Sequence, residues 1–453
     1  MNSTSDTAFT TTGAEPFACL VPATQPARRT NAPHEPFVPL EPASWEQAGV
    51  SQNEVSAIAL RYLLSAGQAT GRNIAEQLKL PFGLTQELLR GLRQQLFLQY
   101  RNTSIVGDFD YELTSQGLDR ARRLSEHCTY CGAAPVAFDA YTTSVRAQSF
   151  QFVRTRIAAV RHAYRDLLLS DAKLYQIGQA IGAARGLFLY GPSGNGKSSV
   201  AERLIRTVGD TIWIPRAISV AGEIIRLFDP SSHVEVQAPP NQQLINASQT
   251  DRRWVCVQRP TIVVGGELTL QHLEVIFNPS RGVNEAPLQL KSNGGVLVID
   301  DFGRQRISAA DLLNRFIVPL EKRFDLVSLP SGRQIQIPFD SMLVFATNLE
   351  PKQVFDDAFL RRLPYKIAMT NPTPAEFRQL FESAAEELGV RFDADCYEQL
   401  LTRHFTGKGR PFRFCHARDL VEQVRTLCEF HEVPAAMSSE VMDVAAHNYF
   451  AGF

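Results

Sequence analysis

The chain has 453 residues, with 46 Lys and Arg against 47 Asp and Glu, so its formal net charge at pH 7 is -1. That length allows two or three domains at about 100 to 200 residues each. The balanced charge excludes a molecule whose overall field attracts nucleic acid or anionic membrane, so any nucleic-acid surface must be local.

The first 45 residues are rich in Thr, Ala and Pro and carry few periodic apolar residues. Such a composition cannot easily offset the entropy of ordering, so residues 1–45 are predicted to be a disordered tail. The start of the chain also lacks the basic and apolar regions of a signal peptide, and no run of about 18 apolar residues occurs. We therefore expect a soluble, cytoplasmic protein that does not contact a membrane.

Residues 46–126 are predicted to form a small helical domain. "SQNEVSAIALRYLLSAG" has helical spacing, "TGRNIAEQLKL" follows Thr70 as a potential cap, and a third helix starts at Leu84. Two extended segments, "LFLQYRN" and "FDYELT", and the helix "SQGLDRARRLSEH" come next. This order is typical of a winged helix-turn-helix, and "YELTSQGLDRARRL" resembles the end of such domains in bacterial regulators.

The partner of this domain is left open by its residues. A recognition helix would present Gln86, Arg90 and Arg93, and Arg101 near the wing could reach phosphate, so DNA binding through residues 84–101 is one alternative. Acids and bases are close to parity across the domain. Protein binding or dimerisation is therefore the other alternative.

Residues 127–150 are predicted to be a linker to the large domain. Within it, Cys128 and Cys131 in "CTYCGAAP" have the spacing of metal ligands. Zinc needs two further ligands, and no second close Cys/His pair is present, so we expect two reduced thiols. The seven cysteines of the chain are odd in number and scattered, which does not indicate a disulfide framework.

"LFLYGPSGNGKSSVAERLI" carries the most specific motif in the chain. A short apolar strand, Leu187 to Tyr190, is followed by the pattern G-x-x-x-x-G-K-[ST] and then by a helix. The glycines let consecutive N–H groups turn toward one anion at the positive end of the helix. Lys197 can reach the β- and γ-phosphates, and Ser198 can offer its hydroxyl to Mg²⁺. The predicted nucleotide-binding residues are Gly191, Pro192, Ser193, Gly194, Asn195, Gly196, Lys197, Ser198 and Ser199.

About a hundred residues separate this loop from the next motif. Within them, "PRAISVAGEIIRLFDPSSHVEV" is predicted to be a β-hairpin turning at Ala221 and Gly222, and "VGGELTLQHLEVIF" a strand and a helix. Two alternatives remain for this segment, a face that contacts a substrate and a structural insertion.

"GGVLVIDDFGRQ" indicates a fully buried parallel strand that ends in two acids. Carboxylates at the C-terminal end of such a strand lie where open α/β sheets bind ligands. Taken alone, the two acids would indicate only a strand whose end is exposed to solvent. Together with the phosphate loop, it predicts that Asp300 holds Mg²⁺ through its water shell and that Asp301 orients or deprotonates the attacking water.

Three polar features follow. "DSMLVFATNLEP" is a strand ending at Asn348, whose amide could bind the water or the γ-phosphate. "DDAFLRRLPYKIAM" is predicted to be a helix ending in Arg361 and Arg362, which either complement the helix dipole or stabilise the transferring phosphoryl group. The remaining chain is predicted to be a helical bundle. There, Arg418 falls in the first turn of its helix, where a cation favours an anion opposite.

Together these motifs resemble the AAA+ ATPases over residues 155–453. "GPSGNGKS" is similar to Walker A, "VLVIDD" to Walker B, "ATN" to sensor 1 and "ARDL" to sensor 2, and the arginine pair lies where an arginine finger is found. Walker B usually ends Asp-Glu, whereas Asp301 is one methylene shorter. The resemblance implies an α/β fold with a parallel sheet flanked by helices in residues 151–370, and a helical lid in residues 371–453.

A branch of this family is also suggested. "EAPLQLKSNGGVLVIDD", "DLLNRFIVPLEKR" and the hairpin "FDLVSLPSGRQIQIPFDSMLVFATN" are similar to the MoxR, magnesium-chelatase and enhancer-binding-protein branch. The turn of that hairpin is expected at Pro330 to Arg333. The whole chain resembles a group of bacterial ATPases with a winged helix in front.

Three functions compete at this point. The first is a Mg²⁺-dependent ATPase that forms a ring, for which the resemblance implies six members, and remodels an unidentified protein partner. The second is an ATP-dependent DNA-binding regulator or transposition helper. The third is a nucleotide switch that holds ATP and hydrolyses it slowly.

Overall fold

The computed structural model describes residues 37–103, 108–152, 154–209, 211–237, 250–350 and 361–451, and residues 37–453 form one compact unit. Of the predicted disordered tail, residues 1–36 lie outside the described residues. The rest of it is packed against the protein: the Phe37 and Trp254 ring centroids are 5.5 Å apart, and Leu40 forms a β-bridge with Thr250. The prediction of disorder was therefore wrong for residues 37–45.

An N-terminal module contains the predicted helices and extended segments, together with two additional elements, the short helix α1 and the strand β1. Ser51, Thr70 and Thr114 cap helices α2, α3 and α5 with their hydroxyls. The strands form an antiparallel sheet in the order β1-β3-β2. The elements are α1 (Trp45–Ala48), α2 (Gln52–Ala66), β1 (Gln68–Thr70), α3 (Gly71–Leu78), α4 (Phe82–Gln94), β2 (Leu98–Thr103), β3 (Phe109–Leu113) and α5 (Ser115–His127).

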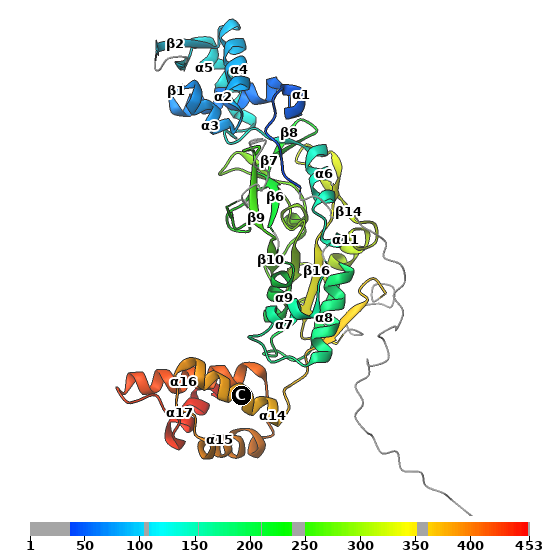
Figure 1. Ribbon diagram of the computed structural model, residues 1–453, viewed down its shortest axis with the longest axis vertical. Helices are drawn as coiled ribbons and strands as arrows, with labels where there is room; N and C mark the ends of the chain where they lie inside the picture. Colours follow the sequence, from blue (N-terminus) through cyan, green and yellow to red (C-terminus); the bar gives the residue numbers. More distant parts are fainter. Residues whose placement is uncertain are drawn as a thin grey trace, which may run out of the picture. The chain divides into compact units, whose positions relative to one another are not determined.

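A parallel sheet in the order β10-β13-β16-β5-β17 forms the centre of the large domain (Figure 1). Its strands are β5 (Leu187–Tyr190), β10 (Thr261–Val264), β13 (Val296–Ile299), β16 (Met342–Thr347) and β17 (Tyr365–Ala368). Because β16 lies between β5 and β13, the ends of the predicted phosphate-loop strand and acidic strand flank the end of β16.

Helices cover both faces of this sheet, and alternate residues of the strands explain why. Val296 and Val298 of β13 pack in one cluster with α7, α8 and α9, whereas Leu297 and Ile299 pack in another with α11. Every side chain of β13 is buried, as the continuous apolar run predicted. These helices are α7 (Ile157–Ala163), α8 (Asp171–Ala183), α9 (Lys197–Arg203), continued by η2 (Leu204–Thr207), and α11 (Ala309–Lys322).

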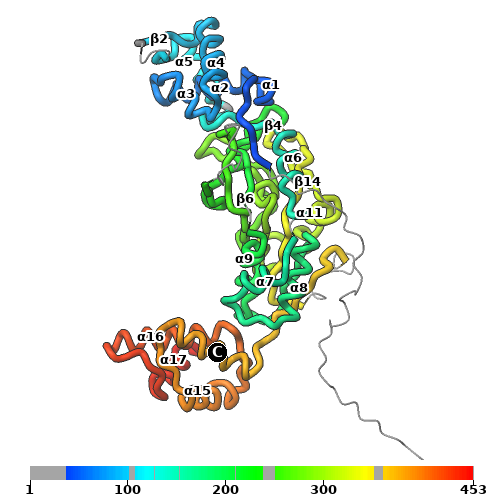
Figure 2. The backbone as a smooth tube through the Cα atoms, in the orientation of Figure 1, coloured from blue at the N-terminus to red at the C-terminus, as the bar shows by residue number. Residues whose placement is uncertain are grey.

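A second sheet, in the order β11-β12-β8-β7-β4, combines the segment between the two motifs with the expected linker. Strand β4 pairs with β7, and Tyr141 of α6 is buried and donates a hydrogen bond to Leu290 O. Residues 127–150 are thus integrated into the fold, because their apolar side chains find partners distant in sequence. Figure 2 traces this path. The elements are β4 (Val136–Ala137), α6 (Phe138–Ala147), η1 (Phe150–Phe152), β7 (Ala217–Val220), β8 (Glu223–Arg226), β11 (Ile276–Asn278), β12 (Val283–Glu285) and α10 (Leu288–Lys291).

Two hairpins were predicted correctly, and a helix was not. Val220 pairs with Glu223, so β7 and β8 turn at Ala221 and Gly222, and β14 (Phe324–Ser328) pairs with β15 (Gln334–Pro338) around the expected turn. "VGGELTLQHLEVIF" shares only Val264 with strand β10 (Thr261–Val264), and in place of the expected helix it contains the short η3 (Leu270–Leu273), followed by β11. Residues 238–249 of this region lie outside the described residues.

A buried arginine joins three segments of the chain. The Arg253 guanidinium donates to Ala48 O at 2.9 Å and Pro135 O at 3.2 Å, and it pairs with Asp251 at 2.8 Å. Both side chains of the pair are 4% exposed. Arg253 immediately precedes β9 (Trp254–Gln258), which pairs with β6 (Thr211–Pro215). The ion pair therefore fastens α1 and the segment before β4 to the β6–β9 ribbon.

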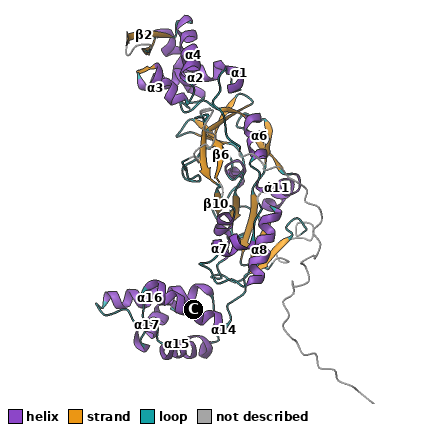
Figure 3. Ribbon diagram, in the orientation of Figure 1, coloured by secondary structure: helices purple, strands orange, loops and turns teal. Residues whose placement is uncertain are grey.

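The C-terminal region is helical (Figure 3). Its core is aromatic: Phe377, Phe381, Tyr397, Phe405 and Phe450 pack with one another. The elements are α14 (Pro374–Leu388), α15 (Ala394–Leu400), the π-turn Leu401–Phe405, η5 (Thr406–Lys408), α16 (Phe414–Phe430) and α17 (Ser439–Phe450). An α/β fold with a parallel sheet flanked by helices, followed by a helical region, is confirmed. Within the described residues, every helix is too short or too polar to cross a membrane.

Candidate functional site

The predicted phosphate loop lies between β5 and α9, at the C-terminal end of the central sheet. Gly191 and Gly194 have φ of 134° and 82°, a backbone region that favours glycine. A Cβ on Gly191 would lie 2.4 Å from Met369 O, and one on Gly194 would lie 2.5 Å from Cys415 Sγ. These two positions require glycine for both conformation and space, whereas Pro192 and Ser193 are exposed at the outside of the loop.

Lys197 connects the loop to the strand beside it. Its buried ammonium donates to Gly191 O and Pro192 O, both at 2.9 Å, and to Asn348 Oδ1 at 2.6 Å. Burial lowers the pKa of Lys197, and the negative charges of Asp300 and Asp301 partly oppose that effect. The structure thus brings together two side chains that are 151 positions apart in the sequence.

Ser198 meets the acidic strand. Its hydroxyl donates to Asp300 Oδ2 at 2.5 Å, so the two predicted magnesium-side groups are in contact. Asp300 is fixed by its backbone N–H, which donates to Val264 O of β10 at 2.8 Å. A hydroxyl and a carboxylate oxygen are ligands of the type that Mg²⁺ prefers. The two residues therefore fit a magnesium ion without supplying its full set of ligands.

Asp301 starts a tight turn after β13. It is exposed with φ of 47°, and its N–H donates to Asp300 Oδ1 at 2.9 Å. Gln305 holds this turn, because its amide nitrogen donates to Asp300 O at 2.8 Å and to Asp301 O at 3.2 Å. Thr347 also contributes by donating its hydroxyl to Phe302 O at 2.7 Å. Sequence reasoning missed Gln305, which no motif marks, and gave no role to Thr347, although Thr347 lies within "ATN".

Asn195 connects the loop to the helical region. Its buried amide donates to Met369 O at 3.1 Å and to Asn371 Oδ1 at 2.8 Å, and its Oδ1 accepts from the N–H of Phe414 at 3.4 Å. Gly194 O accepts a further hydrogen bond from the N–H of Cys415 at 2.9 Å. The first turn of α16 is thus bonded directly to the phosphate loop.

The arginine beside the loop is Arg413 rather than Arg418. Arg413 is the N-cap residue of α16, its Cδ lies 3.6 Å from the Cβ position of Gly194, and its charge contributes to lowering the pKa of Lys197. Arg418 is exposed and binds both oxygens of Glu387, at 3.0 and 2.9 Å. Helix α16 begins two residues earlier than expected, at Phe414, which moves Arg418 from the first turn into the second.

Arg361 and Arg362 lie in a turn before β17. Arg362 pairs with Glu321 of α11 at 2.6 Å. The helix predicted before them falls on residues 351–360, which lie outside the described residues. Arg362 therefore has a partner on the same chain. This contact does not decide whether Arg361 or Arg362 acts as an arginine finger.

Arg61 of α2 contacts the segment that carries Cys128 and Cys131. Arg61 Nη1 lies 3.6 Å from Cys128 Sγ and donates to Tyr130 O at 2.8 Å. In the part of the chain that the structure describes, no group of three or more His, Cys, Asp or Glu side chains is arranged to hold a metal ion.

Comparisons with known proteins give partial matches. A family model described as a domain of unknown function (DUF8689) matches residues 373–448, within the helical C-terminal region. No curated protein matches the chain. Among solved structures, the chain is similar to NtrX from Brucella abortus in complex with ATP, at 14% identity, covering 62% of this chain and 57% of that chain, with a TM-score of 0.39. It is also similar to the Thermotoga maritima RuvB Holliday junction branch migration motor, at 14% identity, covering 64% and 73%, with a TM-score of 0.37.

Proposed function

We propose that this chain is an AAA+ ATPase that binds ATP with Mg²⁺ and hydrolyses it to ADP and phosphate. The observation that carries the proposal is the meeting of Lys197, Ser198, Asp300 and Asn348 at the ends of three adjacent parallel strands. A cation, a hydroxyl, a carboxylate and an amide in that arrangement can hold a triphosphate and its metal ion together. The predicted ligands Gly191, Gly194, Gly196 and Ser199 would supply N–H groups around the phosphates.

The reaction needs positioning and charge stabilisation more than covalent chemistry. Lys197 would release its loop carbonyls and bind the β- and γ-phosphate oxygens, while Ser198 and Asp300 hold Mg²⁺, Asp300 through water. When bound, Mg²⁺ neutralises charge on the phosphates. Asn348 would orient the attacking water, and Asp301 would accept its proton. The water oxygen would bond to the γ-phosphorus while the bond from that phosphorus to the β–γ bridging oxygen breaks, which releases ADP and phosphate.

We expect Asp301→Asn to separate binding from turnover. The substitution keeps the size of the side chain but removes the base, so phosphate release should fall by about 10²- to 10⁴-fold while ATP still binds. Binding is measured with a fluorescent ATP analogue and turnover by released phosphate. Asp171→Asn, at the exposed start of α8, is the matched control and should leave both unchanged. Full turnover in the Asp301 variant would place the base elsewhere.

A second prediction separates the two arginines of α16. We expect Arg413→Ala to lower kcat/KM for ATP by about 10- to 100-fold, because a guanidinium beside the loop can make a charge-assisted bond to phosphate. Arg418→Ala should change kcat/KM by less than about twofold, since Arg418 is held by an exposed Glu387. Steady-state kinetics of both variants measure this. A larger loss for Arg418 would return the role to that residue.

The larger assembly is also part of the proposal. An arginine finger acts on the nucleotide of a neighbouring subunit, so Arg361 or Arg362 would complete the site in a ring, with six subunits as the resemblance implies. Motion of the helical lid against the core would then remodel a protein partner. Mixing Arg362→Ala subunits with Lys197→Ala subunits should restore some activity. Absence of rescue at every ratio would count against action between subunits.

A DNA-binding regulator is the second candidate, favoured by the order of the N-terminal elements. Helix, strand, helix, helix and a β2–β3 hairpin are arranged as expected for a winged helix, with Arg90 and Arg93 exposed on α4. Arg93 stacks over Tyr100 at 4.5 Å, and Arg101 bonds to Gln68, so both cations lie beside strand β2. A gel shift that weakens steeply with salt would support this candidate. No shift at low salt would remove it.

A further inference from the structure

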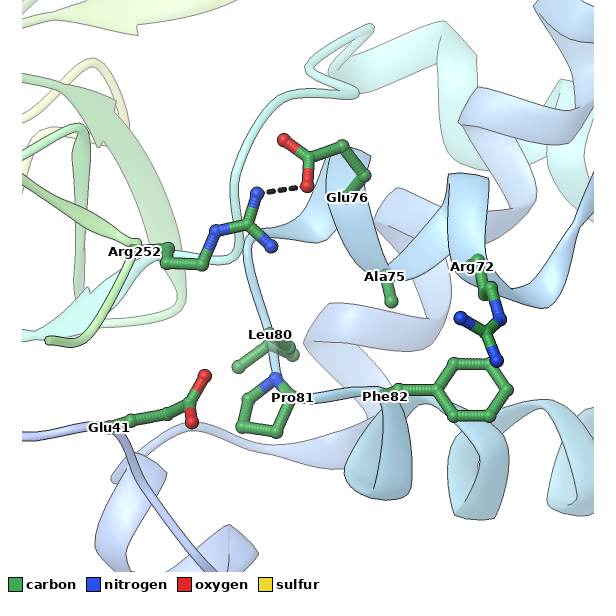
Figure 4. A pocket seen from close by; sticks show the side chains of 8 residues that line it. All are labelled: Glu41, Arg72, Ala75, Glu76, Leu80, Pro81, Phe82 and Arg252. Atoms are coloured by element: carbon green, nitrogen blue, oxygen red, sulfur yellow. Dashed lines mark hydrogen bonds and ion pairs between the residues drawn. The ribbon is translucent and has the colours of Figure 1, made fainter. Parts of the chain in front are cut away.

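A cavity of about 260 Å³ lies apart from the phosphate-loop site and shares none of its residues. Its walls combine aromatic rings with cations: Trp213, Trp254, Lys79, Arg216 and Arg252. A neighbouring pocket of about 380 Å³ lies between α3, the start of α4 and the loop before β9, and Arg252 lines both (Figure 4). Nothing in the proposed ATPase reaction uses these side chains.

The register of the β6–β9 ribbon places both tryptophans on one face. Trp213 pairs with Cys256, and Pro215 pairs with Trp254, so the two indoles are diagonal neighbours on the same side. Ile212, Ile214, Val255 and Val257 point to the opposite side and join a hydrophobic core. Trp254 is buried and Trp213 is only partly buried, so the ring of Trp213 is the more accessible of the two.

Glu76 holds two of the cations together. Its carboxylate oxygens accept hydrogen bonds from Lys79 and Arg252, and these bonds lower the pKa of Glu76 to about 2. Figure 4 shows the Arg252 guanidinium directed at Glu76. Because one carboxylate lies between two cations, this group of three side chains keeps a net positive charge. Glu76 also holds the Lys79 ammonium and the Arg252 guanidinium close enough for both to contact the same bound anion.

The remaining charges do not cancel this field. The one acid of the cavity wall, Asp251, is buried and fully engaged by Arg253. Arg216 pairs with Glu235 at 3.5 Å, and its buried Nε makes no hydrogen bond within the described residues. Asp251 is neutralised by Arg253, and the three cations of the wall face two further acids, Glu76 and Glu235, which leaves one net positive charge at the cavity.

We propose that this cavity binds one nucleotide unit, with its base stacked on Trp213 and its phosphate between Lys79 and Arg252. Aromatic rings accept any base by stacking, and adjacent cations bind the phosphate. The unit could belong to a free nucleotide or to a single strand of nucleic acid, since both present the same base and phosphate. The inference stands apart from the proposed ATPase activity, because the two sites have no residue in common.

Fluorescence tests the proposal directly, since the chain has three tryptophans and two of them line the cavity. The host protein is the full chain with Trp45→Phe, which removes the third, and Lys197→Ala, which removes phosphate-loop binding. It is titrated with AMP and, separately, with an oligothymidylate of about 12 nucleotides. We expect saturable quenching. Quenching by both ligands assigns the site to a free nucleotide, and quenching by the strand alone assigns it to nucleic acid.

Variants on the same host then locate the site. Arg252→Gln and Trp213→Leu should each weaken binding by about tenfold or more, and Arg161→Gln, an exposed arginine on α7, should change it by less than about twofold. Lys79→Gln, at a surface position, serves if Trp213→Leu does not fold. No quenching by either ligand overturns the proposal, and so does quenching that the Arg252 and Lys79 variants leave unchanged.

Discussion

Replacing Lys197 with alanine should lower kcat/KM for ATP by about 10²- to 10⁴-fold. The ammonium would make charge-assisted bonds to two phosphate groups, and each such bond contributes about 1.5 to 3 kcal/mol. Lys197 is buried at the centre of the loop, where it bonds to two loop carbonyls and to Asn348. The alanine variant would therefore have no cation at that position. ATP binding, measured by calorimetry, should weaken in parallel with turnover.

Lys408→Ala is the matched control, because Lys408 is exposed in the helical region. It should leave binding and kcat/KM unchanged. Thermal unfolding without nucleotide should be similar for both variants and the parent protein, since Lys197 makes no buried ion pair with any residue that the structure describes. Unchanged ATP binding in the Lys197 variant would contradict the proposed role of the loop.

Replacing Arg253 with alanine should lower the free energy of unfolding by about 3 to 5 kcal/mol. The change leaves Asp251 charged and buried without its partner, and it orphans the carbonyls of Ala48 and Pro135. Urea unfolding followed by tryptophan fluorescence measures the effect, because Trp254 follows Arg253 and Trp45 lies in the helix that the arginine binds.

Two further variants serve as a control and as a partial rescue for the Arg253 experiment. Arg252→Ala removes an adjacent arginine that is exposed and paired with Glu76, so it should cost less than about 1 kcal/mol. Arg253→Met combined with Asp251→Leu should recover part of the loss, because no unpaired charge stays buried. A loss below about 1 kcal/mol for Arg253→Ala would mean that the pair does not hold these segments together.

The central sheet and the phosphate loop were predictable because both depend on local pattern. "LFLYGPSGNGKSS" fixes strand, turn and helix within a few residues, and the apolar run before Asp300 and Asp301 requires burial on both faces. Parallel strands then bring their C-terminal ends to one edge. The contacts of Lys197 with Asn348 and of Ser198 with Asp300 follow from that topology.

Other features depend on partners distant in sequence and could not be predicted. The expected linker becomes strand β4 and helix α6 because β7 and Leu290, far along the chain, complete their hydrogen bonds. Arg418 lies in the second turn of α16 and not in the first as expected, because the helix starts where it contacts Gly194 and Asn195 and not at a capping side chain in its own sequence. Gln305 acts through two backbone carbonyls, and no spacing rule marks such a contact.

The most direct test of the central claim is the release of phosphate from ATP by the purified chain, with and without Mg²⁺. We predict turnover on the order of 1 per second or faster, lost when Mg²⁺ is chelated and lost in Asp301→Asn. Tight ATP binding with negligible phosphate release would instead identify a nucleotide switch. We would then attribute the slow hydrolysis to the short side chain of Asp301. A protein that neither binds nor hydrolyses ATP in the presence of Mg²⁺ would contradict the account.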